Sequence, residues 1–245
     1  MKKFCFALLA MTLVASVSLS QEKPWTDWTK AEAEKILNHS GWGQTQTDTD
    51  TSEMVYTPTS TPTSRANSVD RASVNSDRVS RGAVNQAVST SYHIRLLSAR
   101  PVRQAFMRVI ELGQTKPDPD LLEGLRAFVE RDFSDYIVVA VDFDSSDGRF
   151  SGPALQAFQS ATLGTLKNKT YLERKDGKRI FLMQYHAPIK DGLGAKFIFP
   201  RNVDNQQFID ANSGSLRFYG EVSGQIKLNV TFKTAEMMYR GQLEY

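Results

Sequence analysis

A continuous apolar run, Tyr136–Asp144, constrains the fold of this chain more than any other stretch. Four of its nine residues are β-branched, and apolar side chains occupy both alternating positions of the run, as Val138 and Val139 illustrate. A strand with one buried face alternates polar and apolar residues, so this run predicts a strand that is covered on both faces. We therefore expect the rest of the domain to pack around it.

The segments around this strand predict an α+β domain over Ser91–Tyr245. Apolar residues recur at helical spacing in Pro101–Leu112 and Asp120–Asp132, which predicts two early amphipathic helices on one face of a mixed sheet. A strand is expected at Tyr92–Leu97, and the order strand, two helices, strand allows it to run parallel to Tyr136–Phe143. A short helix and a largely antiparallel set of strands are expected to follow: Pro153–Ala161, then Thr170–Arg174, Arg179–His186, Lys196–Phe199, Leu216–Val222, Ile226–Lys233 and Met238–Tyr245.

The first twenty residues have the three parts of a secretory signal peptide. Lys2 and Lys3 form a basic start, Phe4–Val17 is apolar, and small residues precede Gln21. The apolar run is shorter than the ~20 residues that span a bilayer, which favours cleavage over the alternative, an uncleaved N-terminal anchor. We therefore expect an exported protein, periplasmic or extracellular, with no transmembrane span after cleavage.

The leader also accounts for the only cysteine and for part of the positive charge. Because Cys5 lies inside it, the mature chain is expected to have no disulfide, no thiol nucleophile and no Cys-bound metal. Loss of Lys2 and Lys3 lowers the formal net charge from +3 to +1. Such a small charge does not indicate a nucleic-acid partner or an anionic membrane surface.

The segment Gln21–Gly43 predicts a short helix flanked by aromatic residues. Thr29 and Glu32 have the spacing of a capping box at its start. All tryptophans of the chain lie in this segment: Trp25, Trp28 and Trp42. Two interpretations stay open, because these rings either pin the helix onto the C-terminal domain or bind a protein or envelope partner, tryptophan being enriched at interface hot spots.

The next segment, Gln44–Thr90, changes character completely. It is rich in Ser, Thr, Asn, Gln and Asp and has almost no large apolar residue. Such a composition buries too little surface to offset its ordering entropy. We expect a disordered linker that tethers the Trp-containing helix.

The acidic loop after the central strand is the strongest candidate for a site. Asp142, Asp144 and Asp147 precede Gly148 in it. Alternating carboxylates before a glycine resemble a calcium loop, although the spacing departs from the EF-hand pattern by one residue and the closing glutamate is missing. The alternative is an ordinary turn in which the aspartates cap backbone amides. A weak calcium site is thus the only cofactor hypothesis, and we otherwise expect none.

Histidines and arginines add little evidence for chemistry. His93 and His186 fall in predicted strands, which favours structural roles, and no histidine pair has zinc-ligand spacing. Four arginines crowd the first strand and helix: Arg95, Arg100, Arg103 and Arg108. We interpret them as a solvated helix face, with a small anion patch as the alternative.

These patterns favour an exported, non-enzymatic protein that acts in binding or in cell-envelope structure. No Walker loop, dinucleotide fingerprint or serine elbow occurs in the sequence. The alternative function is a hydrolase or metal-dependent enzyme centred on the acidic loop Asp142–Asp147 and His186.

Overall fold

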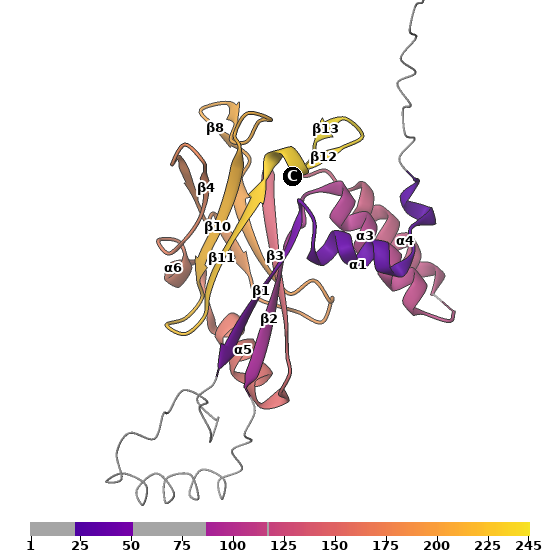
Figure 1. The fold of residues 1–245 in the computed structure, drawn as a ribbon, viewed down its shortest axis with the longest axis horizontal. Helices are drawn as coiled ribbons and strands as arrows, with labels where there is room; N and C mark the ends of the chain where they lie inside the picture. Colours follow the sequence, from indigo (N-terminus) through magenta and orange to yellow (C-terminus); the bar gives the residue numbers. More distant parts are fainter. Residues whose placement is uncertain (1–22, 51–86, 117) are drawn as a thin grey trace, which may run out of the picture.

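The apolar run forms β3, residues Tyr136–Ser145 of the computed structural model, which describes residues 23–50, 87–116 and 118–245. β3 is the middle strand of a five-stranded antiparallel sheet, here called sheet A, with strand order β1-β2-β3-β7-β6 (Figure 1). Residues 137–141 are all buried, so both faces of β3 are covered, as predicted. The other strands of sheet A are β1 (Gly43–Asp50), β2 (Val88–Leu96), β6 (Gln184–His186) and β7 (Ala195–Pro200).

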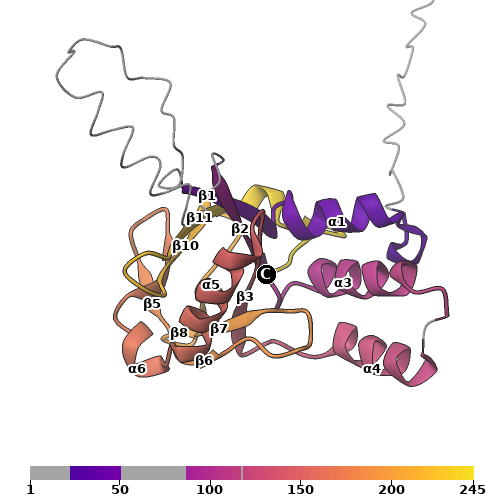
Figure 2. The same cartoon turned by 90° about the horizontal axis from the view of Figure 1, so that it is seen from below.

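Two helices between β2 and β3 set the direction of β3. The helix α3 (Arg100–Gly113) leads the chain away from the sheet and α4 (Pro119–Glu130) returns it (Figure 2). Such a helical hairpin brings the chain back to the end of the sheet that it left. β3 therefore pairs with β2 in the antiparallel sense, with Leu96 opposite Val139. The two helices lie where the sequence predicts them, but the parallel arrangement of the strands is wrong.

A second antiparallel sheet, here called sheet B, has the strand order β11-β10-β4-β5. Its strands are β4 (Thr170–Arg174), β5 (Arg179–Phe181), β10 (Ser215–Glu221) and β11 (Lys227–Lys233). The β4–β5 hairpin turns at Gly177, whose φ is 85°, as its Asp-Gly pair predicts. The single strand predicted over Arg179–His186 is divided between the sheets, because Leu182 still bonds to Thr170 of sheet B while Met183 bonds to Ile198 of β7.

Short elements complete the described part of the chain. The helix α5 (Gly148–Ser160) begins five residues before its predicted start. The predicted last strand forms instead a small hairpin of β12 (Met238–Tyr239) and β13 (Gln242–Leu243), apart from both sheets. The remaining elements are η1 (Trp25–Asp27), α6 (Leu163–Leu166), β8 (Asn202–Val203), β9 (Gln206–Gln207) and η2 (Thr234–Glu236). None of the helices in the described ranges has the length and apolar character needed to cross a membrane.

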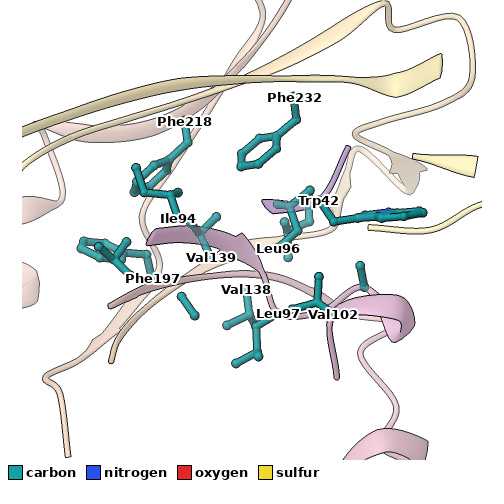
Figure 3. Packing of buried hydrophobic residues seen from close by; sticks show 14 of the residues in the cluster. Trp42, Ile94, Leu96, Leu97, Val102, Val138, Val139, Phe197, Phe218 and Phe232 are labelled. Atoms are coloured by element: carbon teal, nitrogen blue, oxygen red, sulfur yellow. The ribbon is translucent and has the colours of Figure 1, made fainter. Parts of the chain in front are cut away.

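The main core lies between the two sheets. Phe218 of β10 packs on Phe197 of β7, with ring centroids 5.4 Å apart. Figure 3 shows Phe218 and Phe232 pointing from sheet B toward Ile94, Val139 and Phe197 of sheet A. On the opposite face of β3, Val138 points toward Leu97 and Val102, beside the helices (Figure 3). This arrangement explains why β3 carries apolar side chains on both of its faces.

The strand β1 lies in a segment that the sequence predicts to be a disordered linker, so this part of the prediction is wrong. Residues 44–50 and 88–90 belong to strands, whereas residues 51–86, most of the predicted linker, lie outside the described residues. The pairing of β1 with β2 uses polar contacts such as Thr47 Oγ1 with Ser91 Oγ at 3.3 Å. Gln46 also joins the two sheets, because its side chain donates to Lys227 O and accepts from Asn229 N, each at 2.8 Å. A hydrophobic pattern cannot reveal a strand held in this way.

The N-terminal helix α1 (Lys30–Asn38) forms as its capping box predicts. The Thr29 side chain accepts a hydrogen bond from Glu32 N, and the Glu32 carboxylate accepts one from Thr29 N. Ala33 and Leu37 are buried and belong to the main core. This short helix is thus stabilised by packing on α3 and on sheet A.

The capping box should make stability depend on pH in the acid range. Hydrogen bonds from the Lys23 side chain and from Thr29 lower the pKa of Glu32 from 4.5 to about 2. Because the pKa in the folded state is the lower one, the carboxylate stabilises the fold above pH 4.5, and this contribution is lost as the pH falls toward 2. The glutamine in Glu32→Gln keeps an acceptor oxygen but carries no charge. We therefore expect the wild type to unfold at higher urea than Glu32→Gln near neutral pH, and the two midpoints to converge at low pH. A difference in midpoint that stays constant over this range would contradict the prediction.

Candidate ligand-binding cleft

A cleft of about 790 Å³ lies over the outer face of sheet A, the face turned away from sheet B. Its floor is formed by Val138 of β3, Ile198 of β7 and Gln184 of β6, which lie opposite one another across the three strands. Residues directly opposite in antiparallel strands share a face, so these side chains point together into the cleft. The floor is apolar except at the edge strand β6.

One wall of the cleft comes from the end of α4 and the residues after it. Phe128, Arg131 and Phe133 line this side. The guanidinium of Arg131 lies 5.7 Å from the centre of the Phe133 ring. This wall therefore combines aromatic surface with one cation.

The opposite wall is the connection between β6 and β7, which contributes Ile189, Asp191 and Leu193. Asp191 holds this connection in place, because its carboxylate accepts from Lys196 Nζ at 2.7 Å and from Leu193 N at 3.0 Å. Gly194 ends it with a φ of 74°, and a Cβ there would lie 2.1 Å from Val141 O. Glycine is therefore required where the chain returns to the sheet.

Two large apolar side chains at the cleft are exposed to solvent. Tyr136 is 41% exposed and Ile189 is 68% exposed. A concave, mainly apolar site of this volume with a few polar groups is typical of a small-molecule site. The polar groups that line it are Arg131, Gln184, His186, Asp191 and Lys196. The cleft can thus hold an apolar body and hydrogen-bond a polar group at its rim.

The three tryptophans predicted as a binding surface lie away from the cleft. Trp28 and Trp42 are each 8% exposed and belong to the main core, against which Trp25 packs in part. Trp42 Nε1 donates to Glu244 O at 2.7 Å. The rings of Trp28 and Trp42 are therefore used within the domain and are not displayed to a partner.

The proposed calcium residues do not converge. Asp142 and Asp144 lie within β3 rather than in a loop after it, and Asp147 follows the strand. Within the described ranges, no group of three or more His, Cys, Asp or Glu side chains could hold a metal ion. Asp144 meets a histidine instead, since its Oδ2 lies 3.1 Å from His93 Nε2. The other ring nitrogen of His93 lies 3.1 Å from Thr45 Oγ1, so these contacts connect β1, β2 and β3.

His186 is separated from the acidic residues. It lies opposite Lys196, and Lys196 lies opposite Ala140, so β7 stands between His186 and β3. With strands about 4.8 Å apart and a rise of about 3.3 Å per residue, the Cα atoms of His186 and Asp142 are roughly 12 Å apart. The predicted enzyme site is therefore not assembled in this structure, whereas His186 does line the cleft.

Comparison with known proteins gives no guide to the cleft. No protein-family model matches the chain, and neither the curated proteins nor the solved structures contain a match.

The arginines predicted as a solvated helix face mostly join elements of the fold. Arg95 donates to Leu37 O, and Arg108 Nε donates to Trp28 O at 2.7 Å. Arg103 is 4% exposed and donates only to backbone carbonyls, which are those of Leu97, Ser98, Val129 and Arg131. Burial lowers the pKa of Arg103 to about 10, so it stays charged at neutral pH. Two of the four fit the predicted pairing with nearby acids: the half-exposed side chain of Arg100 pairs with Glu130, and Arg108 pairs with Glu111 at 2.7 Å.

A second cavity, of about 360 Å³, lies beside Arg103. Its cations are compensated by carboxylates on the same walls, and Arg201 Nη1 already donates to Tyr245 O at 2.6 Å. The charged residues that line it are Arg100, Arg103, Arg131 and Arg201, with Glu130, Asp132 and Glu244. Because these carboxylates offset the four arginines of the cavity, it is a poor candidate for an anion-binding site.

Proposed function

We propose that this is an exported, non-enzymatic binding protein whose ligand site is the cleft over β3, β7 and β6. The observation that carries the proposal is the pair of exposed apolar side chains, Tyr136 and Ile189, on opposite sides of a concave apolar floor. Isolated exposed apolar residues are ordinary, but several that line one cleft indicate a binding site. The proposal of export comes from the leader.

A small amphipathic molecule fits this site best. Its apolar body would lie along Val138 and Ile198, and a polar or anionic group would meet Arg131 at the α4 end. Lys196 offers less to an anion, because Asp191 already neutralises it. No cofactor takes part in this proposal. A hydrolase is not proposed, because Asp144 contacts His93, and neither residue lines the cleft.

Binding of 1-anilinonaphthalene-8-sulfonate, an amphipathic anion that fluoresces in apolar sites, tests the proposal. We expect saturable binding that oleate displaces. The variant Tyr136→Ser/Ile189→Ser should weaken binding roughly tenfold, since each truncation removes apolar contact area. The matched control is Leu112→Ser/Leu163→Ser, which truncates two side chains that are 42% and 38% exposed away from the cleft.

Near-UV circular dichroism of every variant should match the wild type, because all four positions are exposed. Equal affinity of the dye for the cleft variant and the control variant would show that the cleft is not its site. Absence of saturable binding to the wild type would also contradict the proposal.

A further inference from the structure

The outer face of sheet B, which points away from sheet A, carries an excess of positive charge. Alternation along the strands and the strand registers place six cations of the described residues on this face. Three carboxylates lie against them: those of Glu173 and Glu221 in the sheet, and that of Glu236, which lies 2.9 Å from Lys233 Nζ. The cations are Lys169, Lys175, Arg179, Arg217, Lys227 and Lys233. In Figure 2, β5, β10 and β11 lie on the side of the molecule opposite to α1, α3 and α4.

Pairs within the sheet use only part of this charge. Glu173 pairs with two arginines: its carboxylate accepts a hydrogen bond from Arg179 Nε and lies 3.8 Å from Arg217 Nη1. In the described part of the chain, no hydrogen bond engages the terminal nitrogens of Arg179, whose side chain is 47% exposed. Lys169 is paired with Glu221 at 2.8 Å and is still 56% exposed. Several guanidinium and ammonium donors are thus available to an outside acceptor.

The same face carries a row of aromatic rings whose broad surfaces are largely covered. Tyr171 and Tyr219 stack on each other with centroids 5.2 Å apart and an interplanar angle of 24°. The guanidinium of Arg179 lies 4.4 Å from the centre of the Tyr171 ring, and that of Arg217 lies 5.7 Å from the centre of the Tyr219 ring. Phe181, at the edge of the sheet, is 51% exposed.

These features distinguish between two kinds of polyanion, a single-stranded nucleic acid and a polymer that carries carboxylates and hydroxyl groups. Proteins that bind single-stranded nucleic acid stack successive bases on open aromatic faces. Here the faces of Tyr171 and Tyr219 are occupied, so successive stacking is not available. What the face offers is spaced cations, the hydroxyl of Thr231 and the half-exposed ring of Phe181, which meets Tyr171 edge-on. The amide nitrogen of Asn229 adds a donor, while its Oδ1 accepts from Arg217 Nε at 2.8 Å. Carboxylates and hydroxyl groups match these donors and acceptors.

We propose that the outer face of sheet B binds an acidic polysaccharide, a linear sugar polymer with repeated carboxylates. The cations recur over successive rows of the sheet, and strand geometry separates neighbouring rows on one face by about 6.6 Å. Cations spread in this way suit an extended chain of anions better than one small ion. The site is separate from the cleft on sheet A and does not depend on the function proposed for it.

Fluorescence anisotropy with a labelled oligogalacturonate tests the proposal on the full-length mature protein. We expect binding at low salt that weakens as salt is added. Arg179→Gln/Arg217→Gln should reduce the affinity roughly tenfold, because each arginine donates charge-assisted hydrogen bonds. Lys175→Gln/Lys227→Gln, which touches neither aromatic ring, should also weaken binding. Thermal unfolding shows whether each variant remains folded.

The matched control, Lys30→Gln/Lys35→Gln on α1, removes the same charge elsewhere and should leave the affinity unchanged. An uncharged malto-oligosaccharide should not bind, and an oligothymidylate of equal charge should bind more weakly. Equal losses in the control and the two sheet B variants would overturn the proposal. Absence of binding to oligogalacturonate at low salt, or equal binding of oligothymidylate, would overturn it as well.

Discussion

Replacing Trp42 with alanine should lower the free energy of unfolding by about 3–5 kcal/mol. The Trp42 side chain is buried in the main core, and its ring lies edge-on to Tyr239 with centroids 6.4 Å apart. Its indole nitrogen donates to Glu244 O. Truncation would open a cavity, leave that carbonyl without its donor and loosen the contact between the N-terminal segment and the β12–β13 hairpin. Urea denaturation followed by circular dichroism measures the loss.

Trp25→Ala is the matched control for this experiment. Trp25 is only partly buried and packs at the margin of the core, so its removal should cost clearly less. A large loss for Trp42 and a small one for Trp25 is expected if the segment is held by the domain itself. If Trp42→Ala unfolds at the same urea concentration as the wild type, the packing described for this segment is wrong.

Local chemistry in the sequence predicts several elements because each is decided by neighbouring residues. The Thr29–Glu32 capping box needs only a spacing of three, and the Asp176-Gly177 turn needs only a residue that tolerates positive φ. The burial of both faces of β3 follows from its own sequence, in which consecutive residues are apolar. Such features can be predicted without knowing what packs against them.

Features that depend on the course of the chain were not predicted. Periodicity gives no strand direction, so the reversal made by α3 and α4 was missed. The strand β1 is polar throughout and is held by side chains such as Gln46, which bonds to a strand about 180 residues away in sequence. Burial of Arg103 also depends on four carbonyls from two segments. None of these leaves a pattern in nearby residues.

The cleft could not be predicted from the sequence for the same reason. Its floor joins β3, β7 and β6, and its walls join α4 to the chain between β6 and β7. The exposed Ile189 lies in a segment that has no secondary-structure signal. The predicted site residues, the tryptophans and aspartates, stand out by residue type, whereas the cleft residues are of ordinary types and are brought together by topology.

Replacing Arg103 with methionine should cost about 3–5 kcal/mol of folding free energy, because it removes four hydrogen bonds from one buried, charged donor at about 1 kcal/mol each. The guanidinium of Arg103 joins two parts of the fold, since it donates to Leu97 O and Ser98 O after β2 and to Val129 O and Arg131 O at the end of α4. Methionine keeps the apolar stem, but it does not reach the carbonyls and leaves them without that donor. Because this contact positions the wall of the cleft that carries Arg131, the variant should also bind anilinonaphthalene sulfonate more weakly. Urea denaturation and dye titration measure the two effects.

Arg100→Met provides the matched control on the same helix. The Arg100 side chain is 42% exposed and pairs with Glu130 at 3.3 Å, and such a surface ion pair contributes at most about 1 kcal/mol. Stability and dye binding should therefore stay close to those of the wild type. Equal losses for the two variants would mean that the buried hydrogen bonds of Arg103 do not hold α4 against the sheet. If Arg103→Met loses stability but binds the dye with unchanged affinity, then the position of α4 does not affect the dye site. The dye would in that case bind elsewhere on the protein.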